Sequence, residues 1–463
     1  MYITAAWTAV LAIIGALFGI ALTLTPNFPK TAPSFVLFLV VLLGYYYRDT
    51  LARPIRAGWY GLAAASAVLY VYYMVAIVRE RILEPPYYDF SLYWIYAQVA
   101  VRGQNFYDAN NAVAFLQSLT LPVEAYADRF FDLYFQYPPP SMFFFLPLGH
   151  FGLHSGAVLW YSMLAIGLVV DIGLLSTILL ERRDIETFLV VTILVLGLGS
   201  TYESFGLGQA NCIALLTLLM LWRHRESWWG GAWLTVGILI RPVLALLPLY
   251  LILERYWRAL IGAVVAALLL SALAIARFGT SVFVAYLASF QLVSTGHYPN
   301  KWFAEDQNAS LLGTIVKFMH DVPTQHAAFL NPMYLVIAGL IFVITFLVVV
   351  ALDKSEYSGL AFVLTVPAML MIYPPTGFGS TLLCAVPMAW LLRNRAQFPG
   401  GPLGAMVIVS IAFAASRTTG THYFFATAVL WSALLVMARK ALATKPHAIG
   451  IPGQRLTSLF GIK

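Results

Sequence analysis

The sequence predicts an all-α polytopic membrane protein, in which residues 1–463 form a single integral membrane domain with about 12–13 transmembrane helices. Hydrophobic residues make up 61% of the chain and charged residues only 10%, and apolar runs long enough to cross a bilayer recur along it. Average soluble domains carry roughly 25% charged residues. The composition therefore excludes a soluble globular enzyme, a disordered protein and a nucleic-acid binder, and membrane lipids are the expected surroundings.

A transmembrane helix needs about 20 apolar residues, and somewhat shorter runs are tolerated within a bundle. The first run has no basic stretch before it and no clear cleavage site after it, so it is interpreted as a retained helix. The expected spans lie near residues 5–25, 33–47, 58–78, 156–180, 186–203, 207–222, 229–253, 257–277, 332–352, 358–373, 378–392, 403–416 and 423–438.

Two stretches that mix aromatic, charged and proline residues do not fit as spans, namely 79–155 and 278–331. Cytoplasmic loops carry an excess of Lys and Arg. With the N-terminus in the cytoplasm, most of the 27 Lys and Arg residues fall on the cytoplasmic side, including those of a basic tail at 439–463. The two stretches then become extracytoplasmic loops, and the first is expected to contain helices that lie at the membrane interface.

The segment 229–253 does not follow this alternation, because both of its flanks are basic. About 25 residues are too few for two full crossings. They suffice for a broken hairpin, and Arg241-Pro242 marks a break, since proline lacks a backbone donor and disfavours helix at the preceding residue. The alternative is a single kinked span with one basic loop outside.

A candidate catalytic carboxylate begins the first loop. Asp89 precedes a helical stretch over Phe90–Arg102, and Gly103 suits the helix end. Apolar residues recur there at helical spacing, so this helix is expected at the interface. Asp89 can serve as an N-cap, as a proton-accepting base, or as both.

Arg241 is the single residue that most strongly indicates a functional site in this sequence. An arginine within a bilayer is costly and normally faces a cavity or a partner. Pro242 favours the start of a following half-helix, so a guanidinium and a positive helix terminus would meet at one point and suit a phosphate. The alternative is an ion pair with Asp171, the other charge within an apolar span.

The second loop carries a run of polar residues close to Trp302 and Phe303. Such a run suits sugar hydroxyls, and its alternative is a solvated loop. A short outer turn between two spans carries Gln209 and Asn211, whose amides either bond neighbouring helices or reach the site. The run in the second loop consists of Lys301, Glu305, Asp306, Gln307 and Asn308.

The tripeptide Tyr-Pro-Pro occurs twice near the outer face, at Tyr137 and at Tyr373, where it suits a rigid entry into a helix. His150 and His154 are spaced four residues apart, but they have no apparent third ligand. No phosphate-binding GxxxxGK[ST] loop, HExxH, DxD or GxSxG motif occurs. We therefore expect neither a metal nor a cofactor.

Several blocks in this order resemble glycosyltransferase family eighty-seven, a DUF2029-like family of the GT-C superfamily that includes polyprenyl-phosphate-mannose-dependent mannosyltransferases. The resemblance runs from about residue 85 to about residue 395. The blocks are Asp89 with Tyr93, Gly103 and Tyr107-Asp108; Tyr137-Pro138-Pro139; Gly208-Gln209-x-Asn211; a basic residue before Pro242; and Asn308-x-Ser310-Leu311-x-Gly313.

The resemblance implies a GT-C fold and an inverting transfer of mannose or a related sugar from a polyprenyl-phosphate donor to a lipid-linked or glycan hydroxyl. Asp89 matches the general base, and Arg241 with Lys301 would bind the donor phosphate. The active site would lie on the extracytoplasmic side of a prokaryotic plasma (inner) membrane. The implied substrate-binding residues are Tyr93, Tyr107, Asp108, Tyr137, Gln209, Asn211, Glu305, Asp306, Gln307, Asn308 and Ser380.

The chain departs from the family pattern at three places. Ser380 stands near the position where many members carry a histidine, Ala309 follows Asn308 in place of a glutamine, and Arg241 replaces the usual lysine. The competing hypothesis is a transporter or lipid flippase with a midplane arginine. A transporter predicts paired broken segments in two halves, and the sequence offers one. A structural scaffold explains neither Asp89 nor Arg241.

Overall fold

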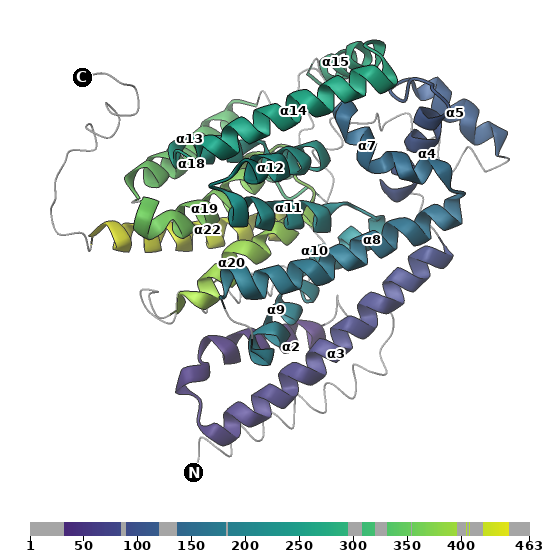
Figure 1. Ribbon diagram of the computed structural model, residues 1–463. Coiled ribbons are helices and arrows are strands. Elements are labelled where there is room, and N and C mark those ends of the chain that lie inside the picture. The colour runs from purple at the N-terminus through teal and green to yellow at the C-terminus, as the bar shows by residue number, and fades with distance from the viewer. Residues whose placement is uncertain are drawn as a thin grey trace, which may run out of the picture.

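A computed structural model provides the fold (Figure 1). The structure describes residues 32–84, 89–119, 137–181, 184–294, 308–319, 331–352, 354–395, 404, 407 and 420–443. Two expected spans, 5–25 and 403–416, therefore lie wholly or almost wholly outside the described residues, as does most of the expected tail at 439–463.

The described residues are helical and contain no strand, in agreement with an all-α membrane protein. A single isolated antiparallel bridge joins Asn308 to Gly377. The elements before the broken segment are α2 (Ala32–Tyr46), η2 (Arg48–Thr50), α3 (Arg53–Leu83), α4 (Asp89–Val101), α5 (Ala109–Ser118), η3 (Pro139–Ser141), α7 (Met142–Phe145), η4 (Leu146–His150), α8 (Leu153–Leu174), η5 (Leu175–Leu179), α9 (Ile185–Leu196), α10 (Gly199–Leu207) and α11 (Asn211–His224).

The broken segment and the elements after it complete the bundle. They are α12 (Trp228–Ile240), η6 (Pro242–Leu246), α13 (Leu247–Leu253), α14 (Trp257–Phe278), α15 (Ser281–Ser294), α17 (Leu311–Met319), α18 (Pro332–Ala351), α19 (Lys354–Ile372), η8 (Phe378–Cys384), α20 (Ala385–Arg393) and α22 (Gly420–Ala443).

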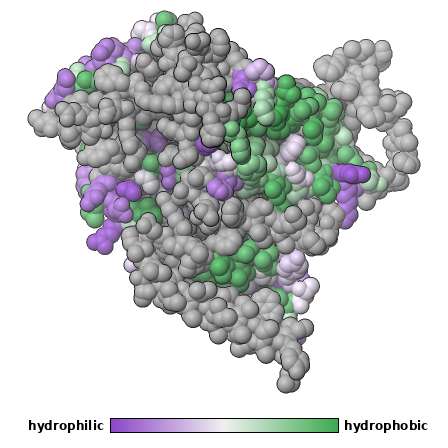
Figure 2. All heavy atoms as spheres, turned by 180° about the vertical axis from the view of Figure 1, so that it is seen from behind, coloured by the Kyte–Doolittle hydropathy of each residue, from purple (hydrophilic) through white to green (hydrophobic). Residues whose placement is uncertain are grey.

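Five helices of the described part are long and apolar enough to cross a membrane, and a bent pair could make a sixth span. The five are α3, α8 with η5, α14, α18 and α22. Helices α14 and α18 expose rows of large apolar side chains, such as Leu268, Leu269, Val336 and Leu340. Figure 2 shows hydrophobic side chains gathered over a broad area of one face. Such surfaces suit contact with lipid chains.

The span expected at 186–203 is not one straight helix but the bent pair α9 and α10. Helix α9 ends at Leu196, and α10 continues after a 60° bend. Leu198 has extended backbone angles, with φ −73° and ψ 127°. At Gly197 an added Cβ would lie 2.1 Å from a ring carbon of Phe38. The bend therefore occurs where α2 packs too closely for any side chain.

The expected span at 378–392 also differs, because its first half is the seven-residue 3₁₀ helix η8. Pro387 lies in the first turn of α20 and has no N–H group to bond the carbonyl four residues earlier. A continuous α-helix through this point would lose that hydrogen bond. The sequence therefore forms a tighter turn before α20.

The first expected loop is more compact than predicted. Helix α3 runs to Leu83, past the expected end at residue 78, and α4 follows it almost directly. Nine of the 13 residues of α4 are buried, so the helix does not expose one whole face. Helix α5, the segment η3–η4 and α8 cover it (Figure 1). Burial of α4 holds its first residue, Asp89, against the bundle.

The segment 229–253 returns to the end where it started. Helix α12 ends at Ile240; the next residue, Arg241, has extended angles (φ −142°, ψ 95°), and η6 and α13 follow. Before α12, Arg225 Nε donates to the hydroxyl of Tyr256, which follows α13, over 3.1 Å. Thr235 of α12 also donates to the carbonyl of Ala263 in α14 over 2.9 Å. Both flanks of the segment therefore lie together, with Arg241 at the far end.

Candidate active site

Asp89 is the first residue of α4 and is partly buried. Its carboxylate oxygen Oδ2 accepts a hydrogen bond from Gln209 Nε2 over 2.8 Å. Gln209 belongs to the turn between α10 and α11, 120 positions further along the chain. Asp89, the predicted base, and Gln209, one of the two amides predicted in this turn, are therefore joined by a direct hydrogen bond.

The turn reaches Asp89 because of Gly208. Gly208 has φ +74°, in the left-handed region that favours glycine. An added Cβ there would lie 2.6 Å from Cβ of Phe90 and 3.0 Å from the Tyr161 hydroxyl. Trp160 Nε1 donates to the Gly208 carbonyl over 2.7 Å and fixes the turn from α8. The turn therefore packs directly against the first turn of α4.

A chain of polar side chains continues behind Gln209. Asn211 Nδ2 donates to Gln209 Oε1 and to Ser204 Oγ, each over 2.8 Å. Ser380 Oγ donates to Asn211 Oδ1 over a longer 3.4 Å. Three predicted substrate-binding residues thus form a support for Asp89, and two of them, Asn211 and Ser380, are buried.

A tyrosine cluster lies within electrostatic reach of Asp89. The hydroxyls of Tyr93 and Tyr137 are 3.0 Å apart, and Tyr107 donates to the backbone carbonyl of Tyr137. The ring of Tyr93 stacks on Phe145 with centroids 4.3 Å apart. Burial raises the pKa of Tyr93 and of Tyr137. Both phenols therefore keep their protons and can donate hydrogen bonds.

Arg241 lies close enough to interact electrostatically with Tyr137, Tyr93, Asp89 and Tyr373. Its Nε and Nη2 atoms are buried and have no hydrogen-bond partner within the described part of the chain. A buried donor without an acceptor costs about 1–3 kcal/mol, and more when it is charged. The guanidinium is therefore available for an anionic group at this position.

The alternative ion pair between Arg241 and Asp171 does not form within the described residues. Asp171 is fully buried in α8, and both of its carboxylate oxygens lack a hydrogen-bond partner there. The expected positive helix terminus is also weaker than predicted. Pro242 begins the five-residue 3₁₀ helix η6, not an α-helix. The positive charge of this site therefore comes from the guanidinium.

Three influences act on the Asp89 carboxyl group. Burial raises its pKa above the ordinary value, while the positive charge of Arg241 and the hydrogen bond from Gln209 lower it, and burial outweighs them. Desolvation disfavours the charged form of an acid, and a cation or a donor favours it. Asp89 is thus a stronger proton acceptor than an exposed aspartate.

Other predicted residues have structural partners. Asp108 is exposed and caps α5, with Oδ1 accepting from the Asn110 backbone N–H group over 3.0 Å. Asn308 is buried and donates to the Pro374 carbonyl over 3.2 Å. These contacts hold loops in place. The remaining predicted residues, Lys301, Glu305, Asp306 and Gln307, lie outside the described residues.

Sequence reasoning missed three members of the site, namely Tyr373, Ser204 and Gly379. The repeated Tyr-Pro-Pro was a usable signal for Tyr373, because Arg241 interacts with both tyrosines of the repeat. For Ser204 the signal was weak, a small polar residue in a glycine-containing apolar stretch. An added Cβ on Gly379 would lie 2.5 Å from Gln209 Oε1. No local pattern marks a close approach of that kind.

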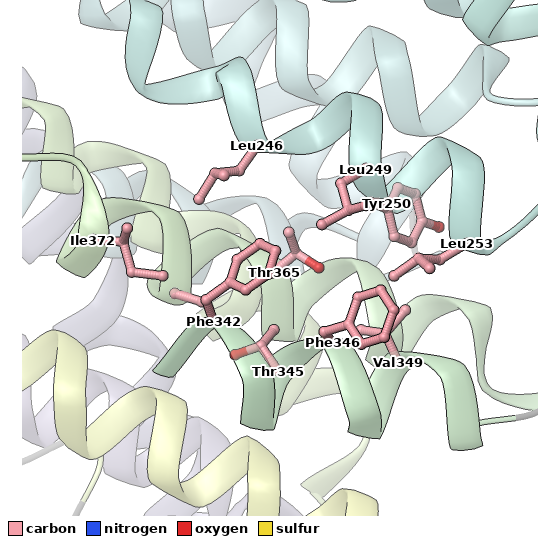
Figure 3. A pocket seen from close by; sticks show the side chains of 11 residues that line it. Leu246, Leu249, Tyr250, Leu253, Phe342, Thr345, Phe346, Val349, Thr365 and Ile372 are labelled. Atoms are coloured by element: carbon pink, nitrogen blue, oxygen red, sulfur yellow. The ribbon is translucent and has the colours of Figure 1, made fainter. Parts of the chain in front are cut away.

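An apolar groove borders the segment that follows Arg241 (Figure 3). It lies between α13, α18 and α19 and has a cavity volume of about 30 Å³. One wall begins in η6, directly after Arg241, and another ends at Ile372, directly before Tyr373. The lining residues are Leu246, Leu249, Tyr250, Leu253, Phe342, Thr345, Phe346, Val349, Thr365, Ala368 and Ile372.

The fold and the site define an all-α polytopic membrane protein with a partly buried carboxylate and a guanidinium close together. Within the described part, no three His, Cys, Asp or Glu side chains group in a way that suits a metal ion.

Residues 135–376, more than half of the chain, match the sequence model of glycosyltransferase family 87. The chain belongs to this family and is a membrane glycosyltransferase, which acts on a sugar donor and an acceptor. No curated protein and no solved structure matches it. The matched region includes Gln209 and Arg241, whereas Asp89 and Ser380 lie outside it.

Proposed function

We propose that this glycosyltransferase moves mannose or a related sugar from a polyprenyl-phosphate donor to a hydroxyl group of a lipid-linked or glycan acceptor. The transfer takes place at the extracytoplasmic face and inverts the configuration of the sugar. The observation that carries the proposal is the placement of Arg241, with two buried and unpartnered nitrogen atoms in the described part, beside Asp89.

Asp89 acts as the general base in this mechanism. It removes the proton of the acceptor hydroxyl while that oxygen forms a bond to the anomeric carbon of the sugar. The bond between this carbon and the phosphate oxygen breaks, and its electron pair leaves with the polyprenyl phosphate. Attack from the side opposite the leaving group inverts the configuration. The raised pKa of Asp89, caused by burial, favours proton uptake in the transition state.

Arg241 stabilises the leaving phosphate. Negative charge grows on the phosphate as the glycosidic bond breaks, and a preorganised cation at this point lowers the barrier. The phenols of Tyr93 and Tyr137 stay protonated and lie within the electrostatic reach of Arg241, and because one donates to the other, the second can donate its proton to the same phosphate. Lys301 is a second candidate for the phosphate.

The apolar groove supports a lipid-linked donor. Its lining begins at Leu246, five residues after Arg241, so apolar side chains of α13 and α18 are available to a hydrocarbon chain attached to a phosphate at Arg241 (Figure 3). Burial of apolar surface contributes roughly 25 cal/mol per Å².

The distribution of basic residues supports an extracytoplasmic site. Arg53 and Arg56 lie at the start of α3 and Asp89 lies just after its end, and a helix of 31 residues is about 45 Å long. Both flanks of the hairpin, at Arg225 and Arg255, are basic and lie away from Arg241. If these flanks are cytoplasmic, Asp89 and Arg241 are extracytoplasmic.

The direct experiment supplies the purified protein with polyprenyl-phosphate-linked sugars and candidate acceptors, and measures the release of polyprenyl phosphate. Wild-type protein should release it and Asp89→Asn should not. Equal turnover by both would remove Asp89 from the role of base. Substrate transport across proteoliposomes without release would instead favour the transporter hypothesis.

The membrane side is tested separately. A cysteine introduced at position 306 should react with an impermeant reagent from the extracytoplasmic side, and wild-type protein is the control because Cys212 and Cys384 are both buried. Labelling from the cytoplasmic side alone would contradict the proposed topology.

A further inference from the structure

We infer that Ser204 and Asn211 keep the side-chain amide of Gln209 in one orientation, with its N–H group toward Asp89. Gly379 leaves the space that this arrangement needs. Ser204, Asn211 and Gly379 are therefore positioning residues for the transfer reaction, which they affect through Gln209. Their role in turnover rests on the proposed function of Asp89 as the base.

The orientation starts from a backbone carbonyl. Ser204 Oγ donates its single proton to the carbonyl of Ser200, one turn earlier in α10, over 2.7 Å, and the carbonyl of Gly379 is a more distant acceptor of the same proton at 3.4 Å. The hydroxyl oxygen is then an acceptor for any other group. Asn211 must therefore present its nitrogen to Ser204, at 2.8 Å.

The same nitrogen sets the orientation of the next amide. Asn211 Nδ2 has a second proton and donates it to Gln209 Oε1 over 2.8 Å. With its oxygen committed to Asn211, Gln209 turns its nitrogen to Asp89 at 2.8 Å. Ser380 supports the arrangement, since its hydroxyl donates to Asn211 Oδ1 over 3.4 Å.

A reversed Gln209 amide would lose both contacts. Its nitrogen would face the nitrogen of Asn211, where two donors meet. Its oxygen would face the carboxylate of Asp89, where two acceptors meet. The first mismatch leaves the buried Asn211 amide without a partner, at a cost of about 1–3 kcal/mol, and the second adds repulsion at the partly buried Asp89. The chain therefore selects one orientation and leaves Oδ1 of Asp89 for the acceptor hydroxyl.

Gly379 provides the space beside the two amides. An added Cβ would lie 2.5 Å from Gln209 Oε1, 2.7 Å from Asn211 Nδ2 and 3.2 Å from Ser204 Oγ. All three atoms belong to the hydrogen-bond chain. Gly377, two residues earlier, has no atom within 4 Å of such a Cβ. The two glycines therefore form a matched pair for mutation.

Two matched pairs test the inference. We expect Gly379→Ala to lower kcat about 10- to 100-fold, because a small misplacement of a catalytic group has effects of that order. Gly377→Ala should stay within about twofold of wild type. Ser204→Ala should lower kcat about threefold to tenfold, as expected for the loss of one hydrogen bond. Ser200→Ala is its control, because the Ser200 hydroxyl is buried without a hydrogen-bond partner in the described part.

A second readout does not depend on turnover. The infrared C=O band of protonated Asp89, identified as the band missing in Asp89→Asn, is followed against pH. The groups that influence or contact this carboxyl are Arg241, Gln209, Tyr93, Tyr137 and Tyr161. Losing the donated bond from Gln209 favours the protonated form. The midpoint should therefore move to higher pH in Gly379→Ala and Ser204→Ala, and not in their controls.

The outcomes separate this inference from the proposed function. If wild-type protein releases no polyprenyl phosphate but the infrared midpoints move as expected, the hydrogen-bond chain stands and the donor assignment fails. If the variants lower the melting temperature while kcat and the midpoint stay at wild-type values, the chain only stabilises the fold. That result overturns the positioning role.

Discussion

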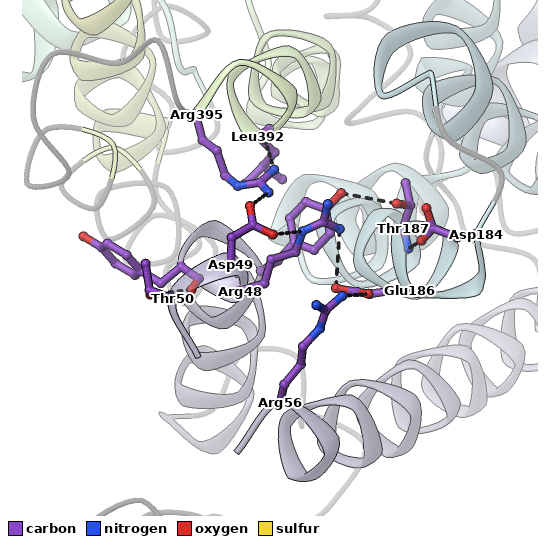
Figure 4. A network of polar contacts seen from close by, with 11 residues as sticks. Arg48, Asp49, Thr50, Arg56, Asp184, Glu186, Thr187, Leu392 and Arg395 are labelled. Atoms are coloured by element: carbon purple, nitrogen blue, oxygen red, sulfur yellow. Dashed lines mark hydrogen bonds and ion pairs between the residues drawn. The ribbon is translucent and has the colours of Figure 1, made fainter. Parts of the chain in front are cut away.

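Two clusters of charged residues, located at the two ends of α3, use the same side-chain types in opposite ways. Before α3, Arg48, Asp49, Arg56, Glu186 and Arg395 form a network of ion pairs (Figure 4). Just after α3, Asp89 accepts from the neutral amide of Gln209, and two nitrogen atoms of Arg241 have no described partner. A cluster whose charges are already paired offers little to a ligand, whereas the second cluster keeps its charge available.

The paired network joins segments that are far apart in the sequence. Glu186 lies 3.4 Å from Arg48 and 2.8 Å from Arg56, and Arg395 pairs with Asp49. These contacts connect the α2–α3 connection with the start of α9 and the end of α20. The network therefore fixes the bundle at one end. At the other end, the buried nitrogen atoms of Arg241 lack partners in the described residues, which costs stability and agrees with the substrate site proposed above.

The largest expected effect comes from Asp89. Asp89→Asn keeps the size of the side chain and removes its ability to accept a proton. General base catalysis contributes about 10²- to 10⁴-fold, so kcat should fall by that factor. The melting temperature should not fall, because the change removes a partly buried charge. A stable variant with wild-type kcat would show that Asp89 is not the base, and the two clusters would then not differ in function.

Arg241→Gln should lower kcat/KM for a polyprenyl-phosphate sugar by about 10²- to 10³-fold, the usual cost of losing one preorganised donor for a developing negative charge. Stability without substrate should stay constant or rise, since Nε and Nη2 of Arg241 lack partners in the described residues. Release of polyprenyl phosphate and thermal unfolding measure the two effects. If the variant unfolds more easily but still turns over normally, Arg241 has a structural role, like the charges of the paired network, and does not bind the phosphate.

The paired network should respond in the opposite way. Glu186→Gln leaves Arg48, whose side chain is only 5% exposed, without one of its carboxylate partners. Breaking a buried ion pair is strongly destabilising, and for this partly exposed one we expect about 1–3 kcal/mol, measured as a shift in denaturant unfolding. Turnover of the folded protein should not change.

Arg56→Gln is the control for this prediction. The Arg56 side chain is 45% exposed, and exposed ion pairs contribute about 0–1 kcal/mol. Its effect on unfolding should therefore be clearly smaller than that of Glu186→Gln. Equal effects would mean that the exposed pair, and not the buried arginine, holds this end of the bundle.

The sequence was sufficient where local chemistry decides the structure. The helical, membrane-spanning class follows from composition, and the helix that starts at Asp89 and stops near Gly103 follows from spacing. Proline after Arg241 marked the break between α12 and η6. Each feature depends on residues within a few positions of one another.

The sequence was insufficient where distant segments meet. Asp89 and Gln209 are 120 positions apart, and Ser380 lies 169 positions from Asn211, so no local pattern pairs them. The burial of α4 was also missed, because its residues suit an interface helix until α5 and η4 are known to cover it. The roles expected of Asp108 and Asn308 in substrate binding stay predictions, and their described side-chain contacts are with the backbone.

The smallest expected effect concerns the pH dependence of turnover. Burial raises the pKa of Asp89, and Arg241 and Gln209 lower it. A base works only when deprotonated, so kcat/KM should decline as pH falls through this pKa, above the ordinary aspartate range. Removing the cation in Arg241→Gln raises the pKa further, and the acidic limb should move toward neutral pH. Arg48→Gln, in the paired network, should leave the limb unmoved. If both variants shift it equally, the fall reflects net charge, and the two clusters do not differ in their influence on Asp89.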